Sequence, residues 1–158
     1  IRLLDVGCGV GNAAFPLLAD ERLAFDIVAF DLSSVAVDVL RAHPQYRRHS
    51  ASDGRRRIAA FVHDIATHDL PPPAAAFDCA LLVFVLSAVA PSQHAAVLAR
   101  IARVLKPGGR IFFRDYACED RAQVRVGGAR RLCFDRASPA TLRSEAGARE
   151  PAAGRASV

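Results

Sequence analysis

A glycine-rich turn near the start of the chain is the pattern best suited to chemistry. Residues 3–12 read LLDVGCGVGN, so that an apolar run ends in Gly7, Gly9 and Gly11. This pattern is typical of a buried strand that turns into a helix, where bare backbone approaches a ligand at the helix N-terminus. Asp31 ends the next apolar run, 20 residues after Gly11. A carboxylate at that place accepts hydrogen bonds from ribose hydroxyls, so we predict a nucleoside-containing cofactor. The alternative is a tight turn with an unrelated surface aspartate.

Three further groups of residues have side chains that can act on a ligand. Arg114 and Asp115 end the last apolar run, where they either contact a ligand or form an ion pair or loop cap. Residues 47–49 (RRH) and 55–57 (RRR) are two basic runs. Such runs either follow a phosphate backbone or simply face water.

The elements that would position these residues alternate along residues 1–116. Apolar runs predict strands at 2–6, 27–30, 58–62, 78–84 and 111–114. Between them we predict helices at 13–19, at 35–42 (capped by Ser33 or Ser34 and stopped by Pro44), and from Pro91 to a turn at 106–109. Strands that read as continuous apolar runs and are separated by helices imply a parallel sheet covered on both faces. The predicted fold is therefore α/β, a Rossmann-like, doubly wound parallel sheet.

Composition narrows the class of protein. The chain has 158 residues, of which 52% are hydrophobic and 23% charged, which is typical of one globular domain. No apolar run approaches the ~18 residues that a membrane-spanning helix needs, so we expect no membrane association and a cytoplasmic setting. The four cysteines lie far apart without metal-ligand spacing, so we expect neither disulfides nor a metal; they are Cys8, Cys79, Cys118 and Cys133. The net charge of +5 permits a polyanionic partner without requiring one.

Residues 117–158 differ from the rest of the chain. They are rich in Ala, Arg, Gly and Ser and hold six large apolar residues, too few to fill a core. We therefore predict two parts, a folded core at 1–116 and a poorly ordered tail at 117–158.

Several motifs together resemble a known family. Asn12 replaces the last glycine of a dinucleotide fingerprint, and Asp5 stands two positions before Gly7; this resembles motif I of class I methyltransferases, which bind S-adenosylmethionine. The strings at 84–89 (FVLSAV), 105–109 (LKPGG) and 113–116 (FRDY) are similar to those of the methyltransferase-like enzymes that make N3-methylcytidine in tRNA. The resemblance covers residues 1 to about 125.

The resemblance implies a cofactor, a partner and a set of site residues. The cofactor would be S-adenosylmethionine and the partner tRNA, through an unpaired anticodon-loop cytidine. If cytosine N3 is the methyl acceptor, we predict Asp115 and Arg114 as the catalytic residues, because they end the last strand at the carboxyl edge and a carboxylate there can stabilise the positive charge formed on the ring. The implied cofactor-binding residues are Asp5, Gly7, Gly9, Gly11, Asp31, Asp64, Ile65 and Val83.

The chain also departs from the family's pattern. The family has an upstream segment with aromatic residues, and after Val126 it continues into a loop and two more strands that this sequence does not match. We therefore expect a core truncated at both ends, without the last strands of the sheet. Two alternatives to a tRNA methyltransferase stay open: a methyltransferase for a small molecule, and a non-catalytic domain that binds the cofactor.

Overall fold

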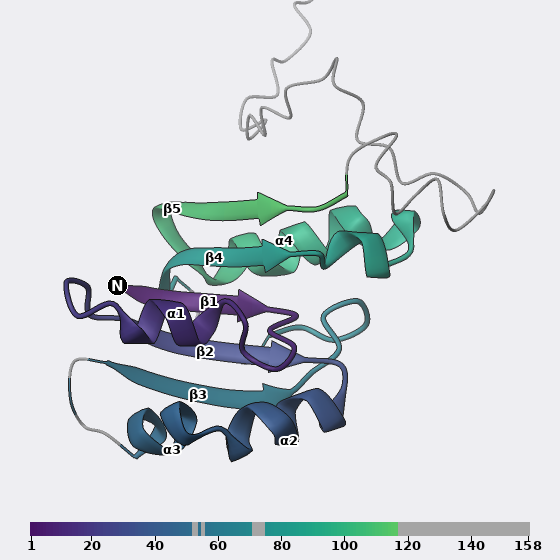
Figure 1. Ribbon diagram of the computed structural model, residues 1–158. Coiled ribbons are helices and arrows are strands. Elements are labelled where there is room, and N and C mark those ends of the chain that lie inside the picture. Colours follow the sequence, from purple (N-terminus) through teal and green to yellow (C-terminus); the bar gives the residue numbers. More distant parts are fainter. Residues whose placement is uncertain (52–53, 55, 71–74, 117–158) are drawn as a thin grey trace, which may run out of the picture.

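The sheet is parallel throughout, as predicted. The computed structural model describes residues 1–51, 54, 56–70 and 75–116. Its strands follow the order β3-β2-β1-β4-β5, and every neighbouring pair is parallel (Figure 1). The strands are β1 (Arg2–Val6), β2 (Asp26–Asp31), β3 (Arg57–Val62), β4 (Phe77–Val83) and β5 (Leu105–Arg114). The Rossmann-like doubly wound fold is thereby confirmed.

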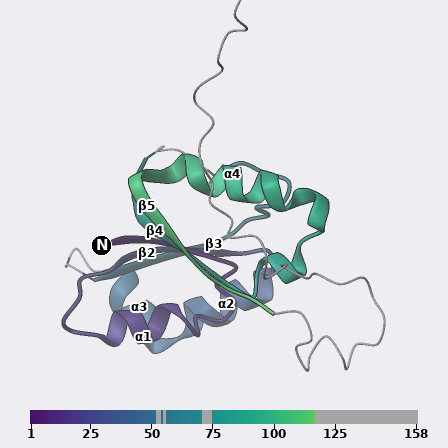
Figure 2. The same ribbon diagram turned by 90° about the horizontal axis from the view of Figure 1, so that it is seen from above.

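Helices cover both faces of this sheet. The helices are α1 (Ala14–Ala19), α2 (Ser34–Ala42), α3 (Pro44–Ser50) and α4 (His94–Val104), with short 3₁₀ turns η1 (Leu86–Ala88) and η2 (Pro91–Gln93). Figure 2 shows α1, α2 and α3 on one face and α4 on the other. Of the two residues that we predicted as the cap of α2, Ser33 is the cap, because its side chain accepts a hydrogen bond from the Ala36 N–H at 3.2 Å.

Two apolar layers result from this arrangement. Successive side chains of a strand point to opposite faces, so Leu3 of β1 packs on the side of α1 and α2 while Leu4 packs on the side of α4. The helices complete the layers with buried residues at helical spacing, such as Leu18 of α1 and Val97 and Ile101 of α4. Both faces of the sheet are therefore packed against helices, and this packing positions the strand ends.

The structure corrects the prediction at Pro44. We expected this proline only to stop the preceding helix, and α2 does end before it, at Ala42. However, Pro44 is also the first residue of a further helix, α3, where its missing N–H is not needed. The His43 ring nitrogen Nδ1 caps α3 by accepting a hydrogen bond from the Gln45 N–H at 3.2 Å.

The glycine turn at 106–109 is a bulge within β5 and not a break before it. Leu105 pairs with Phe77 and Arg110 pairs with Cys79, so the intervening residues form an irregularity in the ladder. In the described part of the chain β5 has a neighbour on one side only, and its Phe112 is about half exposed.

Part of the sequence prediction lies outside the described residues. The tail at 117–158 belongs there, together with Cys118, Cys133 and the boundary that we placed after residue 116. Among the helices that the structure does describe, none has the length and apolar character to cross a membrane.

Candidate cofactor site

A cavity of about 370 Å³ lies at the carboxyl ends of the strands. The strand order reverses between β1 and β4, and open α/β sheets bind ligands at such a switch point. The volume of this cavity falls within the roughly 300–1,000 Å³ that is typical of small-molecule sites. A larger cavity, of about 510 Å³, lies at the opposite edge of the sheet but has neither the glycine turn nor the strand-end carboxylates. Four predicted cofactor residues line the carboxyl-edge cavity: Gly7, Asp31, Asp64 and Ile65.

The glycines of the turn are required by backbone shape and by space. Gly7, Gly9 and Gly11 have φ values of +63°, +54° and +94°, a region that side chains disfavour. A Cβ on Gly7 would lie 2.9 Å from a methyl carbon of Val85, and one on Gly11 would lie 2.5 Å from the Phe15 ring. Gly7 therefore presents bare backbone to the cavity, while Gly9 and Gly11 shape the turn behind it without lining the cavity.

Asp31 is held in place by two backbone N–H groups. Its Oδ2 accepts a hydrogen bond from the Gly9 N–H at 2.8 Å, and its Oδ1 accepts one from the Ser33 N–H at 2.9 Å. A carboxylate oxygen accepts more than one hydrogen bond, so both oxygens keep acceptor capacity toward the cavity. Asp31 thus fastens the glycine turn to the end of β2 and at the same time offers a fixed negative charge.

Asp5 lies beneath the turn and does not line the cavity. Its side chain is buried, with 2% of its surface exposed, and its Oδ2 has no hydrogen-bond partner among the described residues. Burial, followed by repulsion from the nearby Asp31 carboxylate, raises the pKa of Asp5 to about 7. Asp5 is therefore poised to change its charge near neutral pH.

Asp64 is fixed by the loop that follows β3. Its Oδ1 accepts a hydrogen bond from the Ala66 N–H at 2.9 Å, and its Oδ2 accepts one from the Thr67 hydroxyl at 2.6 Å. The hydrogen bond from Thr67 is the largest cause that holds the pKa of Asp64 below its usual value. The neighbouring Ile65 is buried, so this part of the cavity combines a charged and an apolar wall.

Sequence reasoning missed the aromatic wall at the end of β4. Val83 ends β4 but does not line the cavity, whereas Phe84 and Val85 do. Phe84 has a φ of +58°, unusual for a bulky residue, and its N–H donates to the Arg114 carbonyl at 2.8 Å. Its ring lies 4.8 Å from the Tyr116 ring, and the Arg114 guanidinium lies 5.4 Å from its centre. The signal for this wall was the FVLSAV string, which we used only as a mark of the family.

Asp115 forms a loop cap in this structure. Its Oδ2 accepts a hydrogen bond from the Ser87 N–H at 3.0 Å, and its Oδ1 accepts one from the Tyr116 N–H at 2.9 Å. None of the ion pairs between described residues joins it to Arg114. Neither residue lines the cavity, but both contact the segment 84–88 that forms its wall. Their predicted action on a substrate stays a prediction.

The donor set of this cavity fits S-adenosylmethionine. Asp31 can accept from ribose hydroxyls, and the Asp64–Ile65 wall suits a flat base with a polar edge. Gly7 has no side chain, so its backbone lines the cavity directly, and a Cβ there would collide with Val85. The Asp31 carboxylate at the cavity wall favours a positively charged group nearby. Carboxylates and bare backbone thus complement a ribose, a base and a sulfonium.

Comparisons with known proteins agree with this geometry. The model of the family "Methyltransferase domain" matches residues 3–109. The tRNA N(3)-cytidine methyltransferase METTL2 of Danio rerio is 39% identical over 127 residues, which are 78% of this chain and 34% of that protein. METTL6 of Mus musculus, with the same description, is 40% identical over 134 residues, 84% of this chain and 45% of that protein.

Solved structures show the same fold. The crystal structure of the [4+2]-cyclase SpnF has a TM-score of 0.56 and 32% identity, covering 69% of this chain and 36% of that one. An S-adenosylmethionine-dependent methyltransferase from Mesorhizobium loti has a TM-score of 0.52 and 27% identity, covering 70% of this chain and 44% of that one. The matched domain and the cavity agree: the chain belongs to the class I S-adenosylmethionine-dependent methyltransferases, and S-adenosylmethionine is its cofactor.

Proposed function

We propose that this chain is the catalytic core of a tRNA methyltransferase that modifies N3 of cytidine. The observation that carries the proposal is the 39–40% identity to two tRNA N(3)-cytidine methyltransferases over 78–84% of the chain. The chain spans between a third and a half of the length of these relatives, so their substrate is not transferred to it without a test.

The chemistry of the substrate atom determines what the protein must do. S-adenosylmethionine supplies a methyl group on a positively charged sulfur. The lone pair of cytosine N3 forms the new N–C bond while the electrons of the methyl–sulfur bond remain on sulfur, so the positive charge passes to the cytosine ring. No strong base is needed, because N3 carries no proton to remove. The protein's contribution is therefore positioning and stabilisation of the new charge.

The carboxyl edge offers residues for both tasks. N3 is hidden in a base pair, so the cytosine must be unpaired or turned out before it reacts. Phe84 and Tyr116 are both more than two-fifths exposed and form an aromatic surface on which such a base can stack. We assign Arg114 to orienting this surface and Asp115 to accepting a hydrogen bond from the cytosine amino group as the ring becomes positive.

Asp115→Asn tests this assignment. We expect methyl transfer to tRNA to fall by ~10²–10³-fold, the usual effect of removing one group that stabilises developing charge. N3-methylcytidine formed per minute in unfractionated tRNA measures the rate, and calorimetry measures the affinity for S-adenosylmethionine. Because Asp115 also caps Ser87, the melting temperature of the variant is measured as well.

Asp38→Asn is the matched control, since it removes the same charge from an exposed position on α2. A rate for Asp115→Asn within a few-fold of the control would leave Asp115 a loop cap only. A chain that binds S-adenosylmethionine but methylates no cytidine in tRNA would contradict the proposed function. Free small-molecule acceptors are then assayed, to separate a small-molecule methyltransferase from a non-catalytic domain.

A further inference from the structure

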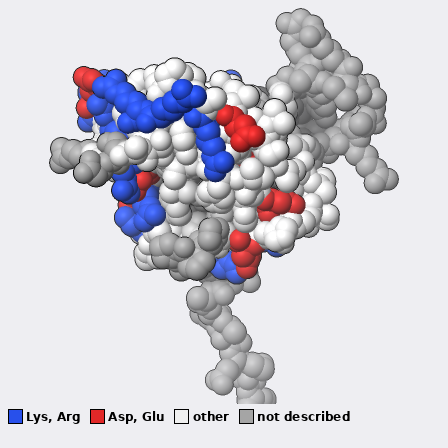
Figure 3. All heavy atoms as spheres, turned by 90° about the horizontal axis from the view of Figure 1, so that it is seen from below, with Lys and Arg blue, Asp and Glu red and all other residues white. Residues whose placement is uncertain are grey.

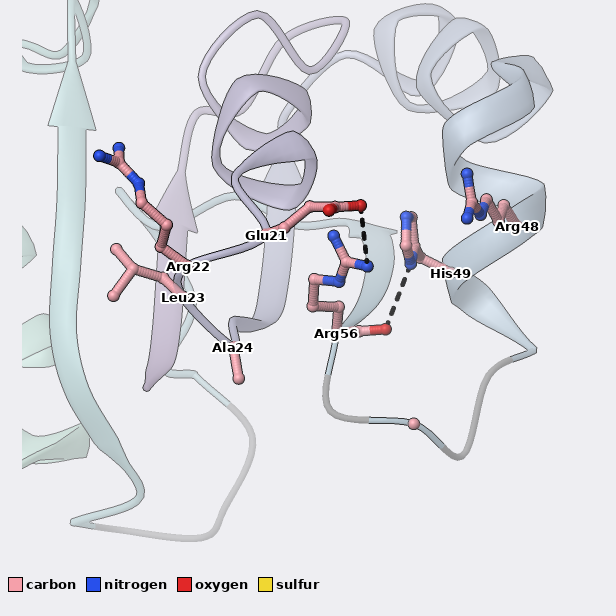
Figure 4. A pocket seen from close by; sticks show the side chains of 8 residues that line it. Glu21, Arg22, Leu23, Ala24, Arg48, His49 and Arg56 are labelled. Carbon is pink, nitrogen blue, oxygen red and sulfur yellow. Dashed lines mark hydrogen bonds and ion pairs between the residues drawn. The ribbon is translucent and has the colours of Figure 1, made fainter.

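The larger cavity lies at the amino edge of the sheet, far from the chemistry. It has a volume of about 510 Å³ and is lined by the segment before β2, the end of α3, and Gly54 and Arg56 before β3. Figure 4 shows Arg48 and His49 from α3 on one side, with Arg56 and Glu21 on the other. Three of its lining residues are arginines, and one of these, Arg22, points away from the group. We call this site the amino-edge cavity.

Arg56 is held in one position by the surrounding backbone. Its Nη1 donates a hydrogen bond to the Leu18 carbonyl at 3.2 Å, and its side chain is 28% exposed. The His49 ring nitrogen Nδ1 lies 3.3 Å from the Arg56 carbonyl oxygen. Since a carbonyl oxygen only accepts, Nδ1 donates the proton of this hydrogen bond. The guanidinium of Arg56 has thus already lost much of the freedom that binding would otherwise cost.

The positive charge at this site is poorly balanced. The acidic neighbour of Arg56 is Glu21, at 3.9 Å, and the Glu21 side chain is 85% exposed, so this ion pair contributes little. Arg48 forms no ion pair within the described part of the chain. Figure 3 shows Lys and Arg side chains as a band over one side of the face formed by α2, α3 and β3.

Helix stability explains only one of the two arginines, Arg48 and Arg56, that line the amino-edge cavity. Cations near the C-terminus of a helix are favourable, which explains Arg48 in the last turn of α3. Arg56 belongs to a different segment, and its own anchor is the Leu18 carbonyl. The helix end therefore does not explain why arginines from two segments meet around one cavity.

We propose that the amino-edge cavity binds a backbone phosphate of the tRNA, a proposal that rests on the proposed function. The guanidinium fork matches phosphate oxygens, and Arg48 and Arg56 line the cavity from opposite sides. The six residues of β2 separate the two edges by about 20 Å at ~3.3 Å per residue. The reacting cytidine is therefore out of reach, whereas a polymer as long as tRNA contacts both edges at once.

Salt-dependent binding of unfractionated tRNA tests the phosphate site. Fluorescence anisotropy is recorded over a series of salt concentrations for the unmodified chain, Arg48→Ala and Arg56→Ala. Each lost phosphate contact lowers the slope of log affinity against log salt by about 0.7–0.9. We expect that loss in both variants, with affinity about five- to tenfold lower at ~0.1 M salt. The Arg48 side chain is exposed and forms no ion pair with a described residue, so Arg48→Ala tests the site even if Arg56→Ala unfolds.

Arg110→Ala is the matched control. It removes one positive charge from an exposed position on β5, at the other side of the sheet from β3. We expect its salt slope to equal that of the unmodified chain. The proposal would be overturned if the salt slopes of all three variants equalled that of the unmodified chain. It would also be overturned if all three variants lost the same amount of slope, or if the chain did not bind tRNA.

Methyl transfer on the same proteins separates this proposal from the proposed function. We expect Arg48→Ala to raise KM for tRNA about five- to tenfold while kcat is unchanged. Loss of salt slope without any methyl transfer would support the phosphate site and contradict the proposed function. Methyl transfer with identical KM values for Arg48→Ala and Arg110→Ala would support the proposed function and contradict the phosphate site.

Discussion

The two cavities lie at opposite edges of one sheet and have opposite electrostatic character. The carboxyl-edge cavity is lined by Asp31 and Asp64, which are fixed by backbone N–H groups, and by the bare backbone of Gly7. The amino-edge cavity is lined by Arg48 and Arg56. Both are built on strand ends, but the first suits a positively charged small molecule and the second an anion. A parallel sheet thus separates two binding tasks by the length of its strands.

The difference also concerns how each charge is held. At the carboxyl edge the carboxylates are partly or fully removed from water, and the pKa of Asp5 rises as a result. At the amino edge the acidic Glu21 is almost fully exposed. Substitutions at the carboxyl edge should therefore change stability and cofactor affinity strongly, whereas those of the exposed amino-edge residues Glu21 and Arg48 should leave both nearly unchanged.

The largest expected effect is the pH dependence caused by Asp5. The unfolded chain releases this proton near pH 3.8 and the folded chain near pH 7, so stability falls as pH rises between these values and then levels off. At ~1.4 kcal/mol per pKa unit, the ionised carboxylate costs on the order of 4 kcal/mol. The Asp5→Asn variant should therefore be more stable to unfolding than the unmodified chain at alkaline pH. At acid pH its stability should differ little from that of the unmodified chain.

Urea unfolding in acid and in alkaline buffer measures this effect. Glu21→Gln is the control from the amino-edge cavity, and its stability should follow that of the unmodified chain at both pH values because Glu21 is exposed. Parallel pH profiles for Asp5→Asn and the unmodified chain would refute the assigned pKa.

Asp31→Ala should have the next largest effect. It removes a carboxylate that would bind two ribose hydroxyls, which costs on the order of 1.5–3 kcal/mol for charge-assisted hydrogen bonds. Calorimetry should then show affinity for S-adenosylmethionine reduced by roughly 10- to 150-fold. Asp38→Ala controls for the loss of charge. Equal affinities of the two variants would mean that Asp31 is a surface aspartate unrelated to the ligand.

A comparison within the glycine turn should give a smaller effect. A Cβ on Gly9 meets no atom within 4 Å, so Gly9→Ala should lower the free energy of unfolding only through its left-handed backbone, by about 1 kcal/mol. Gly11→Ala adds a collision with the Phe15 ring and should lose about 2 kcal/mol or more. Urea unfolding of both variants measures the difference. If Gly9→Ala were the less stable protein, the turn would have another shape.

The smallest expected effect is that of Arg56→Ala on the cofactor. The amino edge is about 20 Å from the carboxyl edge, well beyond the ~8 Å over which charges act at physiological salt. Affinity for S-adenosylmethionine should stay within twofold of the unmodified chain when measured by calorimetry. A larger change would show that the two edges are coupled through the sheet.

Local patterns predicted most of the fold correctly. The five apolar runs became the five strands, because a strand covered on both faces must be apolar along its length. The glycine spacing predicted a turn for a similar reason, since its positive φ values are accepted by few other residues, and Gly7 and Asp31 both line the carboxyl-edge cavity. The helix after Pro44 was missed because proline reads equally well as the end of one helix and the start of the next.

The sequence by itself determined the strand pattern, the glycine turn and the acidic residue after β2, because each depends on neighbours along the chain. Only the tertiary structure decided that Asp115 caps Ser87, that Phe84 leaves β4 to line the cavity, and that Asp5 loses its contact with water. It also brought Arg48 and Arg56 to one cavity from separate segments. These features join residues that are distant in the chain, and burial and charge repulsion act only after the sheet has brought them together.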